Sequence, residues 1–71
     1  MDWIDTKDGT YIRVSSIDMI YDEYLGEDYA HPNVVYAVCG NKTHELREFS
    51  TKAGAIQWIR HFIVNRKKNE D

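Results

Sequence analysis

The sequence contains a single cysteine, Cys39, so no disulfide can form within the chain. Small secreted domains usually depend on several disulfides, whereas a lone thiol is typical of a reducing compartment. We therefore expect a cytoplasmic protein. No apolar stretch approaches the roughly 20 residues that span a bilayer. The first residues, 1–5, show neither a basic start nor a long apolar segment. We expect no membrane span and no secretory leader.

Positive charge is also limited. The chain has 9 lysines and arginines against 12 acidic residues, a formal net charge of -3. Nucleic-acid binding depends on basic surface, so we do not expect a nucleic-acid partner. The small basic group Arg60, Arg66, Lys67 and Lys68 fits the negative end of a helix dipole better than a phosphate backbone.

Motifs that carry chemistry are missing as well. The sequence has no glycine-rich phosphate loop, no serine nucleophile elbow and no paired-histidine helix motif. We predict a protein that is not an enzyme and that holds no cofactor. Its 71 residues allow one domain, 1–71, which buries only about 60 % of its unfolded surface. Domains of this size often gain stability by oligomerising.

The most informative feature that is present is the unbroken apolar run from Val34 to Cys39. A strand on a half-solvated sheet alternates apolar and polar residues, because successive side chains point to opposite faces. A continuous run instead indicates a strand that is covered on both faces.

The N-terminal segment predicts a hairpin of strands 2–6 and 10–14 around a turn at Gly9. A three-residue loop pairs Ile4 with Ile12, Thr6 with Thr10 and Asp2 with Val14, and gathers the aliphatic side chains on one face. A two-residue loop would instead set Ile4 against Arg13. The apolar pattern favours the longer loop.

Three more strands are predicted, at 19–25, 34–39 and 43–49, after a short corner at 15–18. The strand at 19–25 alternates poorly and carries Asp22 and Glu23, which suits an edge. A two-residue turn after Cys39 puts Leu46 on the face of Val35, Ala37 and Cys39, and a three-residue turn puts it with Val34, Tyr36 and Val38. We favour the first, because small Ala37 and Cys39 leave room for helix side chains.

An amphipathic helix is expected at 52–66, capped by Ser50 or Thr51, with a frayed tail at 67–71. Its apolar stripe follows 3- and 4-residue spacing and contains Ala55, Ile56, Trp58, Ile59, Phe62 and Ile63. The predicted fold is therefore α+β: an antiparallel β-meander of about five strands with one C-terminal helix packed on one face.

Only one face of this sheet receives a helix, so three apolar side chains of the run point away from it in either register. We expect the helix-free face to be an interface. Its predicted residues, with tyrosine, tryptophan and arginine typical of binding hot spots, are Trp3, Tyr11, Arg13, Val34, Tyr36 and Val38. The simplest occupant is a second copy, which predicts a homodimer and a protein-interaction module. Loops folded over this face are the alternative.

A second candidate surface is acidic and aromatic and lies within residues 22–29. Its carboxylates are Asp22, Glu23, Glu27 and Asp28. Charge runs are usually solvated, but this one could also dock on a basic protein surface through electrostatic complementarity.

Cysteine and histidine chemistry is the alternative from another class. Cys39 and His44 could be cross-strand neighbours and, with His31 or His61, form a zinc site. By residue type, a Cys–His nucleophilic dyad is a further alternative. The short paired spacing of zinc ligands is absent, and an apolar run disfavours a thiolate. We predict no metal site and no catalytic residue.

The pattern resembles short bacterial and prophage proteins with a β-meander followed by one helix. The resemblance lies in the Asp8-Gly9 turn, the YIRVSSIDMIY segment at 11–21 and the REFSTKAGAIQWIRHFI segment at 47–63. Such proteins mostly lack an assigned function. Small acidic phage proteins include inhibitors of host enzymes, so the resemblance implies an inhibitor as one possible role.

Overall fold

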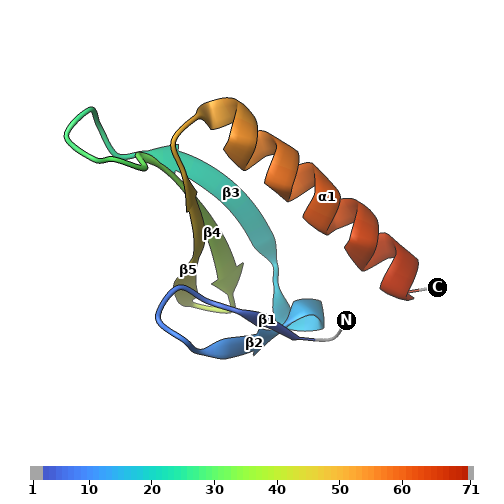
Figure 1. The fold of residues 1–71 in the computed structure, drawn as a ribbon. Coiled ribbons are helices and arrows are strands. Elements are labelled where there is room, and N and C mark those ends of the chain that lie inside the picture. Colours follow the sequence, from blue (N-terminus) through green and yellow to red (C-terminus); the bar gives the residue numbers. More distant parts are fainter. Residues whose placement is uncertain (1–2, 71) are drawn as a thin grey trace.

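The computed structural model describes residues 3–70, with side chains described through residue 65. Within residues 3–70, five strands and a short 3-10 helix precede one long helix (Figure 1). The elements, in chain order, are β1 (Trp3–Asp5), β2 (Tyr11–Arg13), η1 (Val14–Ser16), β3 (Met19–Tyr24), β4 (Asn33–Cys39), β5 (Lys42–Phe49) and α1 (Lys52–Glu70). The α+β class is confirmed.

The strands form two sheets, so the prediction of a single five-stranded sheet is wrong. One sheet is the β1–β2 hairpin and the other has the order β3-β4-β5. The chain breaks between them because Val14–Ser16 form a turn of 3-10 helix in place of continuing strand. Serines favour such local backbone turns over sheet ladders. The predicted edge position of β3 is confirmed, since β3 is the terminal strand of its sheet.

The first hairpin has the predicted three-residue loop. Ile4 lies opposite Ile12, and the Thr6 N–H donates to the Thr10 carbonyl at 2.7 Å. Gly9 has a φ of 90°, which a residue with a side chain rarely adopts. The predicted pairing of Asp2 with Val14 involves a residue outside those described.

The β4–β5 hairpin has the favoured two-residue turn, because Cys39 lies opposite Lys42. Leu46 therefore packs with Val35 and Ala37 in the core, as predicted. A register shift follows between Val35 and Tyr36, so that Arg47 rather than Leu46 is the partner of Val35. This bulge was not predicted; such irregularities increase the local bend and twist of a strand.

The helix begins at Lys52 and is capped by Thr51, whose Oγ1 accepts the Gly54 N–H at 3.1 Å. It continues to Glu70, so the predicted end at 66 is wrong, while Asp71 of the predicted tail lies outside the described residues. Residues 67–70 contain no glycine or proline, the residues that most often stop a helix. No helix within residues 3–70 has the length and hydropathy to cross a membrane.

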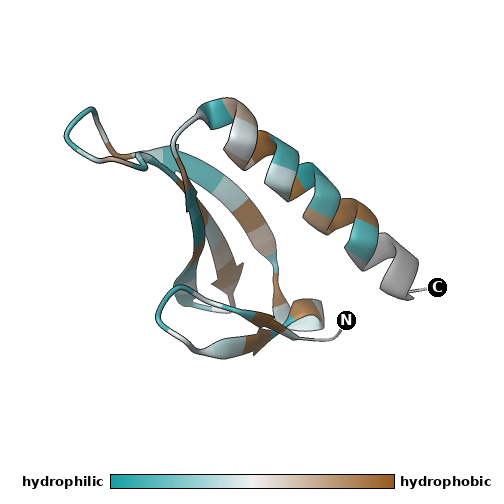
Figure 2. Ribbon diagram, in the orientation of Figure 1, coloured by the Kyte–Doolittle hydropathy of each residue, from teal (hydrophilic) through white to brown (hydrophobic). Residues whose placement is uncertain are grey.

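One core joins the hairpin, the three-stranded sheet and the helix. Its buried residues come from all three parts: Ile4, Ile12, Val14, Ile17, Val35, Ala37, Leu46 and Ala55. Trp58, Ile59 and Phe62 of the predicted helix stripe pack against it, whereas Ile63 is 41 % exposed. Figure 2 shows the hydrophobic stretch along β4 and the largely hydrophilic loop between β3 and β4. The hairpin and the helix thus cover the same face of the β3-β4-β5 sheet.

Candidate interaction surface

The opposite face of the three-stranded sheet, called here the outer face, is defined by the strand register. Residues directly opposite each other on antiparallel strands share a face. Three rows of partners run across the sheet on this side: Met19–Val38–Thr43, Tyr21–Tyr36–Glu45 and Glu23–Val34–Glu48. None of these residues belongs to the core cluster found among the described residues. The prediction that Val34, Tyr36 and Val38 point away from the helix agrees with this register.

Two tyrosine rings form the centre of the outer face. Tyr21 and Tyr36 are stacked, with ring centroids 5.4 Å apart and an interplanar angle of 26°. Both are half-buried, as is Val38, and Met19 beside them is 53 % exposed. Burial and the nearby Glu45 and Glu23 raise the pKa of the Tyr36 hydroxyl. The hydroxyl therefore stays protonated at neutral pH and can donate a hydrogen bond.

Val34 occupies the third row between Glu23 and Glu48 and is only 1 % exposed. It belongs to the outer face by register, yet it offers almost no area to a partner. The contact area at this end of the face comes from its two glutamates.

Carboxylates surround the tyrosines, and Lys7 from the first hairpin loop reaches two of them. Its Nζ lies 3.1 Å from Glu45 Oε2 and 2.5 Å from Glu48 Oε2. The lysine N–H groups donate to both glutamates, which raises the pKa of Lys7 and lowers that of Glu48. The outer face keeps an acidic rim, because Lys7 pairs with two of its glutamates and Glu23 is the third.

The hairpin residues of the predicted interface lie on a different sheet. Trp3, Tyr11 and Arg13 are exposed on the side of β1–β2 that points away from Ile4 and Ile12. The Arg13 guanidinium lies 4.8 Å from the Trp3 ring centroid. The structure therefore divides the six predicted residues into two groups, one on each sheet.

The four predicted acidic residues are also divided. Asp22 and Glu23 are consecutive in β3 and point to opposite faces, and Asp22 Oδ2 lies 3.9 Å from Lys52 Nζ on the helix side. Glu27 and Asp28 are exposed in the loop that projects beyond the sheet (Figure 1). Tyr29, 56 % exposed, accompanies them.

The cysteine and the histidines are spread over the molecule. Cys39 packs against the core, and burial, with the negative charge of Asp18, raises the pKa of its thiol. His44 lies opposite Ala37 and is two residues after Lys42, the partner of Cys39. His31 and His61 are exposed elsewhere. Among the described residues, no group of three metal-ligating side chains lies close enough to hold an ion.

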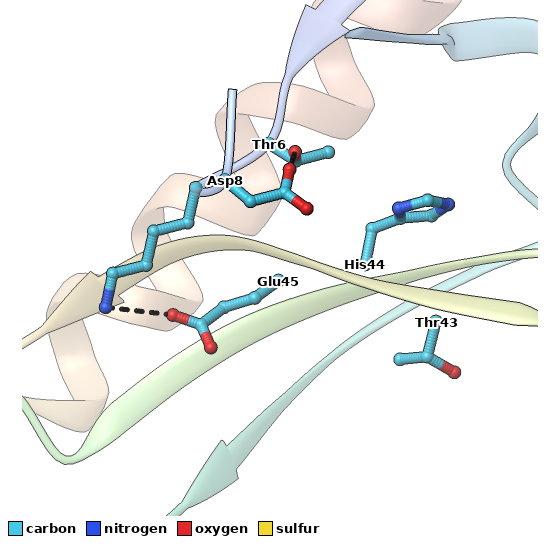
Figure 3. A pocket seen from close by; sticks show the side chains of 6 residues that line it. Thr6, Asp8, Thr43, His44 and Glu45 are labelled. Carbon is cyan, nitrogen blue, oxygen red and sulfur yellow. Dashed lines mark hydrogen bonds and ion pairs between the residues drawn. The ribbon is translucent and has the colours of Figure 1, made fainter. Parts of the chain in front are cut away.

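A polar joint connects the first hairpin to β5, and sequence reasoning missed it. The Lys7 N–H donates to the Glu45 carbonyl at 2.8 Å, and Arg47 donates to the Asp5 carboxylate and carbonyl. An open hollow of about 480 Å³ lies beside this joint, lined by Thr6, Lys7, Asp8, Thr43, His44 and Glu45 (Figure 3). Its groups bond to one another, since Thr6 donates to Asp8 and Lys7 pairs with Glu45. The hollow marks a structural contact.

Met19 and Tyr21 of the outer face were also missed as surface residues. Their signal was available: alternate residues of an edge strand, Met19, Tyr21 and Glu23, pair with Val38, Tyr36 and Val34 once β3 is placed next to β4. The predicted meander places these two strands side by side, but their register came only from the structure.

Comparison with protein-family models, with curated proteins and with solved structures finds no match for this chain.

Proposed function

We propose that the chain is a small protein-interaction module, not an enzyme, and that it binds its partner through the outer face of the β3-β4-β5 sheet. The observation that carries the proposal is the stacked Tyr21–Tyr36 pair, placed beside exposed Met19 on a sheet face whose residues lie outside the core that the helix and the hairpin share. Tyrosines at the centre of a patch are typical of binding hot spots.

The charges around the tyrosines select the partner. Glu23, Glu45 and Glu48 ring the patch, and Lys7 compensates only part of their charge. A second copy stacked on this face would bring the two acidic rims together, and like charges in contact are unfavourable. A different protein with an apolar centre and a lysine- and arginine-rich rim fits better. The homodimer is therefore the less favoured occupant.

The loop between β3 and β4 supports a second candidate, an inhibitor that docks this loop on a basic host protein surface. Glu27, Asp28 and Tyr29 are exposed at its tip, clear of the sheet. A basic surface that normally binds nucleic acid is the kind of target that such a loop would block. Both candidates act in the cytoplasm and require a basic protein partner.

The experiment is affinity capture from cells of the source organism, followed by affinity measurements on the purified partner. Tyr36→Ala tests the outer face, and Met19→Ala repeats the test at an exposed position whose change leaves the core intact. Tyr11→Ala is the matched control, because it removes an exposed tyrosine from the other sheet. We expect at least about tenfold weaker binding for Tyr36→Ala, as for a hot spot, and little change for Tyr11→Ala.

Asp28→Lys separates the two candidates. Loss of binding for Asp28→Lys, with Tyr36→Ala unaffected, would move the site to the loop. Both surfaces would be excluded if every variant binds the partner as tightly as the wild type does: Tyr36→Ala, Met19→Ala, Tyr11→Ala and Asp28→Lys.

A further inference from the structure

The outer backbone edge of β3 is open. β3 is the terminal strand of its sheet and pairs with β4 alone over all six residues, Met19 to Tyr24. The backbone hydrogen bonds found within residues 3–70, and the side-chain hydrogen bonds found within residues 3–65, include none to this outer edge. An edge of this kind presents unpaired N–H and C=O groups to any strand that approaches.

The register shows which residues present those groups. The Leu25 N–H donates to the Pro32 carbonyl at 2.8 Å, so the backbone groups of Leu25 point toward β4. Hydrogen-bonding direction alternates along an antiparallel strand, so Tyr21 and Glu23 also point toward β4. Ile20, Asp22 and Tyr24 point outward, and each offers one donor and one acceptor.

A second copy of β3 finds only one long register at this edge without directly opposed carboxylates. Two copies of β3 related by a two-fold axis would pair in antiparallel fashion. Residues whose backbone groups point outward must then lie opposite each other, which leaves three registers that pair most of the strand. These registers are centred on Tyr21, Asp22 or Glu23. Two of them set a carboxylate directly opposite its own copy, which is destabilising. The third puts Asp22 opposite Ile20, and Glu23 opposite Met19.

We infer that this edge accepts an extended, lysine- or arginine-rich segment of a partner protein as an added strand. The partner backbone would bond to Ile20, Asp22 and Tyr24. Its alternate side chains would lie beside Glu23 on the outer face or beside Asp22 on the helix face, where Lys52 is 3.9 Å away. This inference deepens the proposed function and rests on it for the basic character of the partner.

The test uses a peptide probe, an acetylated and amidated eight-residue peptide of alternating lysine and valine. Titrated into the labelled full chain, it should slow the amide hydrogen exchange of Ile20, Asp22 and Tyr24 several-fold. The amides of Tyr21 and Glu23, already bonded to β4, serve as an internal control and should not change. The same peptide with a central proline, or with glutamate in place of lysine, should bind at least about tenfold more weakly, because it loses a ladder bond or the charge match.

Two variants of the protein complete the test. Tyr24→Pro removes an outward N–H that the fold does not use, and edge strands tolerate proline. Glu23→Lys reverses a charge at an exposed position, and Glu27→Lys is its control in the loop. We expect Tyr24→Pro and Glu23→Lys each to weaken peptide binding about tenfold, and Glu27→Lys to change it little.

Two results would overturn the inference. One is slowed amide exchange confined to the loop between β3 and β4, with none in β3. The other is a proline-containing peptide that binds as tightly as the lysine–valine peptide. The proposed function would then still be judged by Tyr36→Ala against the captured partner. Conversely, Tyr36→Ala should leave peptide binding unchanged, because Tyr36 lies on β4 and not at the β3 edge. Failure of the edge inference and failure of the proposed function are therefore distinguishable.

Discussion

At the scale of single residues, burial separates two leucines with different roles. Leu46 is 1 % exposed and packs in the core, whereas Leu25 is 37 % exposed after β3. Removing buried methyl groups leaves a cavity as well as losing transfer free energy. We predict that Leu46→Ala lowers the free energy of unfolding by about 2–5 kcal/mol, measured by urea denaturation. Leu25→Ala is the control, with an expected effect below about 1 kcal/mol. Equal effects would contradict the placement of Leu46 in the core.

Lys7 permits a prediction about pH. The lowered pKa of Glu48 means that its bond to Lys7 stabilises the fold fully above the unfolded-state pKa, near 4, and is lost as pH falls through the lower folded value. The raised pKa of Lys7 means that its contribution is present below about pH 10 and is lost as pH rises through the folded value. The melting-temperature difference between the wild type and Lys7→Met should therefore be largest near neutral pH.

The measurement is a series of thermal melts from pH 2 to pH 11. The difference between the wild type and Lys7→Met should shrink at both ends of this range. Lys42→Met is a matched change on β5 at the far end from the joint, and its difference from the wild type should vary less. A Lys7→Met difference that stays constant with pH would show that the joint does not depend on these charges.

At the scale of elements, the helix start depends on one hydroxyl. Thr51 Oγ1 accepts the Gly54 N–H at 3.1 Å, which satisfies one of the free donors of the first turn. We predict that Thr51→Ala lowers the free energy of unfolding by about 0.5–2 kcal/mol in chemical denaturation. Ser50→Ala removes the neighbouring hydroxyl and should have little effect. A large effect of Ser50→Ala with a small effect of Thr51→Ala would instead identify Ser50 as the N-cap.

Local pattern predicted the individual elements well. The alternation around Gly9 gave the first hairpin and its register, and the helical spacing gave the buried stripe with Trp58 and Phe62. The pattern missed the bulge at Leu46 and Arg47, because a bulge changes pairing without changing the apolar period. It also ended the helix too early, since the basic residues after Arg66 are good helix formers as well as suitable C-terminal residues.

At the scale of the molecule, the predicted meander order holds within each sheet, but the break between the two sheets and the position of the first hairpin were not predicted. The position of the hairpin depends on contacts between distant residues, such as Arg47 with Asp5 and Lys7 with Glu45, which leave no periodic signal. This is why Trp3, Tyr11 and Arg13 were predicted on the same face as Tyr36. The apolar run 34–39 did predict a face without a helix, and the register assigns that face to Val34, Tyr36 and Val38.

The acidic rim of the outer face leads to a prediction about assembly. Sedimentation at tens of micromolar should show a monomer at physiological salt, because stacking two outer faces opposes Glu23, Glu45 and Glu48 with their copies. The control is Glu45→Gln combined with Glu48→Gln, which removes most of the repulsion and should increase any self-association. A wild-type dimer that dissociates on Tyr36→Ala would instead establish the second copy as the occupant.

Binding of a basic protein partner through the outer face is tested best by the affinity of that partner for Tyr36→Ala relative to Tyr11→Ala. We expect a loss of at least about tenfold in affinity for Tyr36→Ala and a near wild-type affinity for Tyr11→Ala. Met19→Ala should also weaken partner binding. Unchanged affinity for Tyr36→Ala, in a variant whose folding is intact, would show that the partner does not bind through the outer face.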